Sequence, residues 1–186
     1  MKPEEYLRLM HTLEGLKNVT RHSWTSDGHH ESVAEHSWRL ATMALFLRGE
    51  FPDADIDKVL RMCLVHDLGE IFTGDIPSFD KTAADTARED DLLAAWVASL
   101  PEPTRTELAD FYREMDARET TEAKLYRALD GFEAVIQHNE ADLSTWTELE
   151  RSLNLTYAAD RTAFSPWLTA LRAAMREETE RKLAEK

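Results

Sequence analysis

Apolar residues recur at helical spacing along almost the whole chain, and this periodicity constrains the fold more than any other feature of the sequence. One stripe runs through Val33, Leu40, Met43 and Leu47, and such spacing is typical of the inward face of an amphipathic helix. We find no convincing alternation of apolar and polar residues of the kind that indicates a strand. The pattern therefore predicts an all-α protein, a single-domain helical bundle.

Capping and helix-breaking residues mark the ends of the predicted helices. Ser32-Val33-Ala34-Glu35 has the form of a capping box, in which the first and last side chains satisfy each other's backbone amides. Ser165-Pro166 has the form of an N-cap followed by a first-turn proline. Residues 18–31 and 73–83 are predicted to be loops, and the charged tail 176–186 is expected to fray. The predicted helices cover about residues 6–16, 33–50, 56–69, 92–100, 104–115, 119–140 and 166–186.

Length and composition are those of an ordinary globular domain. The chain has 186 residues, of which 42% are hydrophobic and 31% charged, and this size supports one core without disulfide bonds. The only cysteine, Cys63, fits a reducing compartment. Residues 1–5 contain no apolar segment, and no apolar run approaches the length of a bilayer span. We therefore expect a cytoplasmic protein with no membrane association.

The formal net charge of −14 bears on the partners of this chain. Nucleic-acid binding depends on neutralising many phosphates with Lys and Arg, so this composition argues against a nucleic-acid polymer as ligand. A phosphorylated substrate is then expected to be small, and to be held by a local positive cluster or a metal ion. The same charge fits a soluble acidic protein equally well.

Polar residues interrupt the apolar faces of three predicted helices. His36 lies on the inward face of the second helix, His66-Asp67 ends the apolar third helix, and Asp130 lies beside Gly131 in the long helix. An unpaired buried carboxylate costs several kcal/mol, so these groups need partners. Two imidazoles and two carboxylates form a ligand set suited to Mn, Co, Fe, Zn or Mg. Taken singly, His36 fits a hydrogen-bonded core histidine and Asp130 an acid on a helix surface.

Together, these positions resemble the H…HD…D signature of the HD phosphohydrolase superfamily. The sequence segments around them are similar to those of the deoxynucleotidase branch of this superfamily. They are residues 31–37 (ESVAEHS) and residues 66–77 (HDLGEIFTGDIP). The resemblance covers roughly residues 7–140, which we take as the core of one HD domain spanning residues 1–186. C-terminal helices at about 145–186 complete this predicted domain.

The resemblance implies a role for each matching residue. His36, His66, Asp67 and Asp130 would hold one divalent metal ion, and Glu70 would be the catalytic acid. Glu70 follows His66 by four residues and Asp67 by three, so a helix that continues past Gly69 would place all three on one face. Alternatively, Glu70 is an exposed acid near a helix end. The substrate loop would be formed by Asp75, Ile76, Pro77 and Ser78.

Arg21 precedes His36 by fifteen residues, the separation at which the family has an arginine that contacts phosphate. The planar guanidinium suits that role because it donates two parallel hydrogen bonds. Trp24 follows in an Arg-x-x-Trp order, whereas the bacterial members have the tryptophan directly after the arginine. Trp24 is therefore either a sugar contact or a cover over the core.

The remaining loop and helix histidines are weaker candidates. His29 and His30 lie in the polar segment before the capping box, and we expect both to be solvated. His138 follows Asp130 by eight residues, which places it too far along the helix to share the same ion.

The resemblance implies a metal-dependent phosphohydrolase that removes the 5'-phosphate of (deoxy)nucleoside monophosphates, and it implies a homodimer. Other HD reactions fit less well: no histidine occurs between 67 and 130 to serve a di-iron centre, and guanosine-polyphosphate hydrolases usually have two adjacent acids where this chain has Gly69-Glu70. Two alternatives remain open. One is hydrolysis of another small phosphorylated nucleotide, and the other is a non-catalytic helical module that binds metal or nucleotide.

Overall fold

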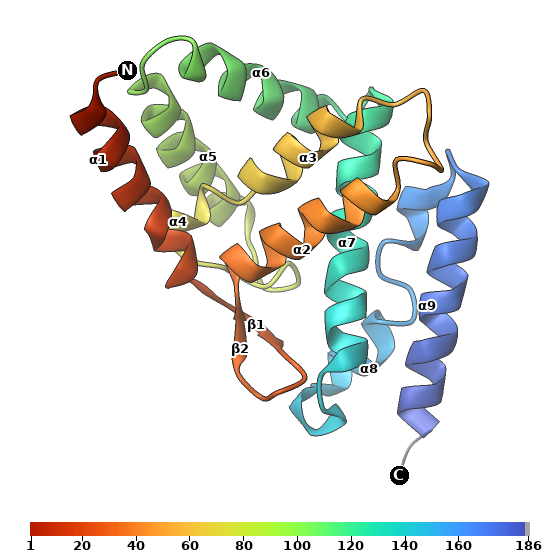
Figure 1. Cartoon of the computed structure of the whole chain (residues 1–186). Helices are drawn as coiled ribbons and strands as arrows, with labels where there is room; N and C mark the ends of the chain where they lie inside the picture. The colour runs from red at the N-terminus through yellow and green to blue at the C-terminus, as the bar shows by residue number, and fades with distance from the viewer. Residues whose placement is uncertain (185–186) are drawn as a thin grey trace.

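The computed structural model describes residues 1–184, which form α-helices and a short β-hairpin (Figure 1). The strands are β1 (Thr20–Trp24) and β2 (His30–Ser32), and the 3-10 helices are η1 (Glu14–Lys17), η2 (Leu143–Thr145) and η3 (Ala159–Thr162). The α-helices are α1 (Pro3–Leu13), α2 (Val33–Phe46), α3 (Ile56–Val65), α4 (Glu70–Thr73), α5 (Ala83–Ala98), α6 (Thr104–Ala117), α7 (Thr121–Glu140), α8 (Glu148–Leu153) and α9 (Pro166–Ala184).

The main core lies around α7, the long helix that runs between α2 and α9 in Figure 1. Leu40 of α2, Val59 of α3 and Leu129 of α7 are fully or almost fully buried in one cluster, which Leu168 of α9 also joins. Burying such side chains is the main force that holds helices together. The arrangement confirms the predicted all-α helical bundle, and it sets α2, α3 and α7 side by side.

A smaller core forms where α5 and α6 pack at the end of the molecule away from α9 (Figure 1). Val97 and Leu100 from the end of α5 meet Leu108 and Phe111 of α6. Within residues 1–184, no helix combines the length and apolar character that crossing a bilayer requires.

The predicted caps are present at both helix starts that the sequence singled out. Ser32 accepts a hydrogen bond from the Glu35 amide at 3.2 Å, while the Ser32 amide donates to the Glu35 carboxylate at 2.7 Å. At the start of α9, the Leu168 amide donates to Ser165 Oγ at 3.3 Å. The helices α2 and α3 end at Phe46 and Val65, a few residues earlier than the apolar pattern indicated.

The prediction of a loop over residues 18–31 was wrong, because this segment contains most of the β-hairpin. Thr20 pairs with Ser32 and Trp24 with His30 in antiparallel register. A strand of three residues, such as β2, is too short to show alternation. Its stability comes from pairing with β1 and from packing against the bundle, which local sequence does not reveal.

The expectation that the charged C-terminal tail frays was also wrong for the described residues. The last helix continues to Ala184, and Thr179 is buried within it. Thr179 Oγ1 donates to Asn139 Oδ1 at 2.9 Å, and Asn154 Nδ2 donates to Thr179 Oγ1 at 3.1 Å. These polar contacts fix the tail to α7 and to the end of α8. Residues 185–186 of the predicted tail lie outside the described residues.

The third helix does not continue past Gly69 as the predicted placement of Glu70 required. It ends at Val65, the chain turns, and Glu70 begins the separate short helix α4. The Glu70 amide donates to Asp67 O at 3.0 Å, so the turn is tight. The side chain of Glu70 is nevertheless buried, on the same side as the polar residues that end α3.

Candidate metal centre

The four predicted ligands come from α2, from α7 and from the turn that follows α3, and they lie close together. We call them the metal centre (His36, His66, Asp67 and Asp130). His36 Nε2 lies 3.3 Å from His66 Nε2 and 3.4 Å from Asp130 Oδ1. Asp67 Oδ2 lies 2.8 Å from His66 Nε2 and 3.9 Å from His36 Nε2. Ligand atoms of His36, His66 and Asp67 all lie within 4.8 Å of one another, which is the compactness that a single ion requires.

The other ring nitrogens of both histidines are already occupied, and this fixes which nitrogen faces the centre. His36 Nδ1 donates to the buried Glu133 carboxylate, and His66 Nδ1 donates to Cys63 O at 2.9 Å. Such outer hydrogen bonds are the usual way in which proteins orient histidine ligands. They leave the two Nε2 atoms facing each other, and a divalent ion bound there would replace the proton on His36. The donor set therefore fits a metal ion.

Electrostatics at the centre also favours a positive charge. Burial and Arg21 act to lower the pKa of His36, but Asp130 and Glu133 outweigh them and raise that pKa to about 9. Burial alone would raise the pKa of Asp130, yet His36, His66 and Arg161 hold it well below its usual range. At neutral pH the pocket thus contains ionised carboxylates that need a cation, which a bound metal supplies.

Glu70 is a buried acid beside the metal centre. Glu70 is only 6% exposed, and among the described residues its Oε2 atom has no hydrogen-bond partner. Burial, followed by the charges of Asp67, Asp75 and Glu89, raises the pKa of Glu70 to about 10. A carboxyl group that keeps its proton at neutral pH can act as a general acid.

A cavity of about 510 Å³ opens beside the metal centre, and Asp67, Glu70 and Asp130 line it. This volume is in the usual range for small-molecule sites. The segment between α4 and α5 also lines the cavity and contributes all four residues of the predicted substrate loop. These are Asp75, Ile76, Pro77 and Ser78.

Comparison with known proteins places this geometry in a family. The family model described as HD domain matches residues 13–172. The chain belongs to the HD-domain family. It is 32% identical to the 5'-deoxynucleotidase HDDC2 of Mus musculus over 72% of this chain and 68% of that protein. A relative with the same name from Dictyostelium discoideum is 30% identical over 84% of this chain and 87% of its own length.

A solved structure supports the same fold along nearly the whole chain. The crystal structure described as a predicted metal-dependent phosphohydrolase from Magnetospirillum magnetotacticum MS-1 superposes with a TM-score of 0.81 at 30% identity. The match covers 96% of this chain and 95% of that one. The helices around the metal centre are therefore part of a fold that the two proteins share along nearly the full length of both chains.

Arg21 lines the cavity of this HD domain and is paired with two buried acids. Its Nη1 lies 3.3 Å from Glu31 Oε2 and 3.2 Å from Glu133 Oε2. The sequence did not assign roles to these two glutamates. Glu133 follows Asp130 by one helical turn, and this spacing was the signal available for it. Glu133 both orients His36 and holds Arg21, so it couples the metal centre to the predicted phosphate contact.

The structure does not bring Trp24 to the cavity. Among the described residues, Trp24 is absent from the cavity wall and instead packs on His30, with ring centroids 3.9 Å apart. His29 and His30 are exposed, as expected for solvated residues. This position supports neither predicted role directly, because Trp24 packs on a histidine of the hairpin and not on the cavity or the main core.

Four basic residues, scattered in the sequence, also gather at the cavity wall, although the chain is strongly acidic overall. They are Lys81, Arg118, Arg127 and Arg161. Arg161 Nη1 lies 3.5 Å from Asp130 Oδ2 and donates to Arg127 O at 2.9 Å. The same wall also has five acidic residues, so the basic side chains provide local positions for an anionic group and not a net positive charge.

Gly131 allows the turn that bears Arg161 to approach α7. A Cβ atom added at Gly131 would lie 2.5 Å from Ala158 Cβ and 2.8 Å from Arg161 Nη1. We therefore expect Gly131→Ala to destabilise the protein by about 1–3 kcal/mol through overpacking, although alanine is favoured over glycine in helices. Urea denaturation would measure the change.

The control for this substitution is Gly49→Ala, because nothing lies within 4 Å of a Cβ added at Gly49. It should leave the free energy of unfolding nearly unchanged. A Gly131→Ala protein as stable as the wild type would show that there is room for a methyl group between α7 and the segment with Ala158 and Arg161.

Proposed function

We propose that this HD-domain protein is a divalent-metal-dependent phosphohydrolase that removes the 5'-phosphate from deoxynucleoside monophosphates, with nucleoside and inorganic phosphate as products. The observation that carries the proposal is the junction of the metal centre with a cavity that also holds Glu70 and Arg21. A purely structural metal site needs neither a protonated carboxyl group nor a guanidinium beside it. The relatives named 5'-deoxynucleotidase support the same reaction.

In the proposed reaction, His36, His66, Asp67 and Asp130 hold the ion. When bound, a divalent ion offsets the charge on a phosphoryl group and lowers the pKa of water. Arg21 donates hydrogen bonds to the phosphate oxygens and fixes the phosphorus next to the metal centre. It reaches this position because Glu133 and Glu31 hold its guanidinium at the cavity wall.

Glu70 handles the proton in this scheme. Its raised pKa means that it carries a proton at neutral pH, which it donates to the leaving 5'-oxygen as the bond from that oxygen to phosphorus breaks and a water oxygen bonds to phosphorus. The attacking water loses a proton to solvent, and the Glu70 carboxylate takes up a proton from solvent, which restores the starting state. The loop from Asp75 to Ser78 forms the wall of the cavity, and we propose that it contacts the sugar and base.

A second candidate substrate class follows from the basic residues around the cavity. Lys81, Arg118, Arg127 and Arg161 are available to contact phosphate groups other than the one that Arg21 contacts. This favours small nucleotides with additional phosphates as an alternative to monophosphates.

Phosphate release from a panel of nucleotides tests both proposals. With Mn²⁺ or Co²⁺ present, we expect deoxynucleoside 5'-monophosphates to be hydrolysed faster than ribonucleotides, 3'-monophosphates and oligonucleotides. Faster release from nucleoside di- or triphosphates would favour the second class. Absence of release from every nucleotide in the panel, by protein shown to contain metal, would contradict the proposed function.

We also propose that the protein forms a homodimer through the outer face of α2. Trp38 and Phe46 on this helix are 66% and 81% exposed, and large exposed aromatic side chains are typical of association surfaces. Light scattering coupled to size-exclusion chromatography would measure the mass. A monomer at micromolar concentration would contradict the dimer.

A further inference from the structure

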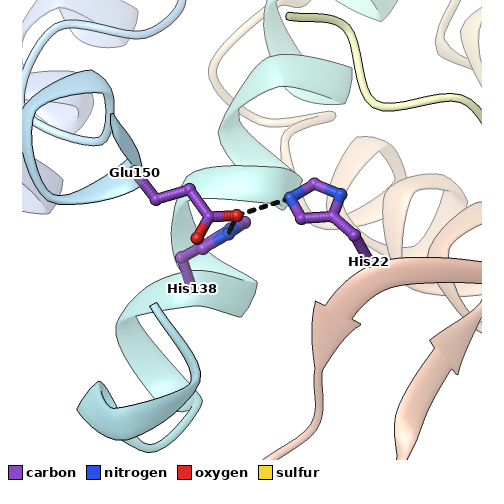
Figure 2. A group of neighbouring side chains, drawn as sticks. All are labelled: His22, His138 and Glu150. Carbon is purple, nitrogen blue, oxygen red and sulfur yellow. Dashed lines mark hydrogen bonds and ion pairs between the residues drawn. The ribbon is translucent and has the colours of Figure 1, made fainter. Parts of the chain in front are cut away.

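A second cluster of ligand-type side chains lies in the same cavity, away from the metal centre. His22 comes from β1, His138 from the end of α7, and Glu150 from α8, and their side chains converge on one point (Figure 2). Glu150 Oε1 lies 2.8 Å from His22 Nε2 and 3.2 Å from His138 Nε2. One ligand atom from each residue lies within 4.8 Å of the other two.

The outer hydrogen bonds orient this cluster as they orient the metal centre. His138 Nδ1 donates to Ala134 O at 2.9 Å, which turns Nε2 toward the cluster. Glu150 Oε2 is occupied by the amide and hydroxyl of Thr147, at 2.6 and 2.8 Å, and this leaves Oε1 to face the histidines. Ordered outer contacts of this kind accompany metal ligands in proteins.

A hydrogen-bond network alone leaves part of the cluster unexplained. His22 Nε2 is buried and close to Glu150 Oε1, yet among the described residues it has no partner in hydrogen-bond geometry. A buried imidazole nitrogen without a partner is costly. A cation between the nitrogen and the carboxylate would satisfy both atoms, because each would direct a lone pair at the ion.

The charge states at neutral pH are those of metal ligands. Burial, together with His138, lowers the pKa of His22, so its imidazole is neutral. Burial alone would raise the pKa of Glu150, but hydrogen bonds from His138 and Thr147 lower it to about 2, so its carboxylate is ionised. The cluster therefore offers the neutral imidazole of His22 and the ionised carboxylate of Glu150.

We propose that His22, His138 and Glu150 form a second site for a divalent transition-metal ion of the zinc type. Two histidines and one glutamate are a known three-residue ligand set for zinc, which leaves a fourth position open. All three residues line the cavity, so that open position faces a water molecule or a cavity ligand. The site would also fasten β1 to α7 and α8.

The second site is separate from the metal centre. His138 follows Asp130 by eight residues on α7, which corresponds to roughly 12 Å along the helix axis. Ions that act together on one phosphate lie about 3.5–4 Å apart, so the two sites do not form a co-catalytic pair. The proposal therefore does not depend on the phosphohydrolase activity, and it can be tested by metal content alone.

The test is the zinc content of protein that has been stripped with chelator, reloaded with Zn²⁺ and freed of excess metal. Wild-type protein should retain about two ions per chain, and Glu150→Gln about one. Glutamine keeps the capping box with Thr147, so this variant should fold. The matched control is Glu148→Gln on the same helix, whose side chain is 95% exposed, and it should retain both ions.

His138→Gln provides an independent variant, with the same expected loss of one ion. Asp67→Asn should lose the ion of the metal centre and keep the second, which separates this proposal from the proposed function. If Glu150→Gln binds one ion fewer than the wild type and Asp67→Asn does not, the second site is supported even when the four residues of the metal centre bind no ion. The second site would be overturned if wild-type protein retains about one ion per chain and both Glu150→Gln and His138→Gln retain that ion.

Discussion

Replacement of Asp67 by asparagine is expected to reduce phosphate release by more than about 100-fold, since even changes to residues outside the ligands typically cost 10–100-fold in metal affinity or activity. Asp67 supplies a charged oxygen 2.8 Å from His66 Nε2, and asparagine keeps the shape while it removes the charge. The variant should also lose the rise in melting temperature that Mn²⁺ gives the wild type, because bound ligand stabilises the folded state.

Asp57→Asn is the matched control for this substitution. Asp57 lies on α3, and its side chain is 70% exposed, where it pairs with Arg48. Surface ion pairs contribute little to stability, so activity and thermal response to metal should match those of the wild type. Wild-type turnover by Asp67→Asn would contradict the assignment of Asp67 as a ligand.

The second large effect is expected at Glu70. Glu70→Gln should lower the turnover number by roughly 10²–10⁴-fold while metal content and substrate affinity stay close to those of the wild type. Glutamine preserves the size of this buried side chain but has no proton to donate to the leaving oxygen. Steady-state kinetics and metal analysis on the same preparation would measure both quantities.

The outcomes for Glu70→Gln distinguish three roles. Loss of turnover with metal retained fits proton transfer, as we expect. Loss of the ion would mean that Glu70 is itself a ligand, and nearly unchanged turnover would mean that its role is in packing.

The fold class was accessible from the sequence because it depends on helical register, whereas the proposed metal ligands were indicated by the resemblance of the H…HD…D positions to the HD family. His36 lies in the apolar stripe of α2, so its burial follows from the periodicity, and its residue is fully buried in the structure. The capping box at Ser32 fixed where that helix begins. Beside Asp130, a Cβ atom added at Gly131 would lie within 3 Å of Ala158 and Arg161, so glycine is required for their close approach to α7.

Other parts of the site depend on contacts between distant segments, which periodicity does not report. Glu133 is one of 36 acidic residues, and only the packing of α2 against α7 shows that it supports His36. The hairpin was missed because β2 has three residues and is stabilised by its partner strand. It is this hairpin that carries His22 to His138 and Glu150.

Metal removal from the wild-type protein tests the central claim most directly. Phosphate release from a deoxynucleoside 5'-monophosphate would be measured before chelation, after chelation and after the addition of Mn²⁺ or Co²⁺. The geometry of His36, His66, Asp67 and Asp130 predicts that chelation abolishes release and that the added ion restores it. Full release by protein shown to be free of metal would contradict the account.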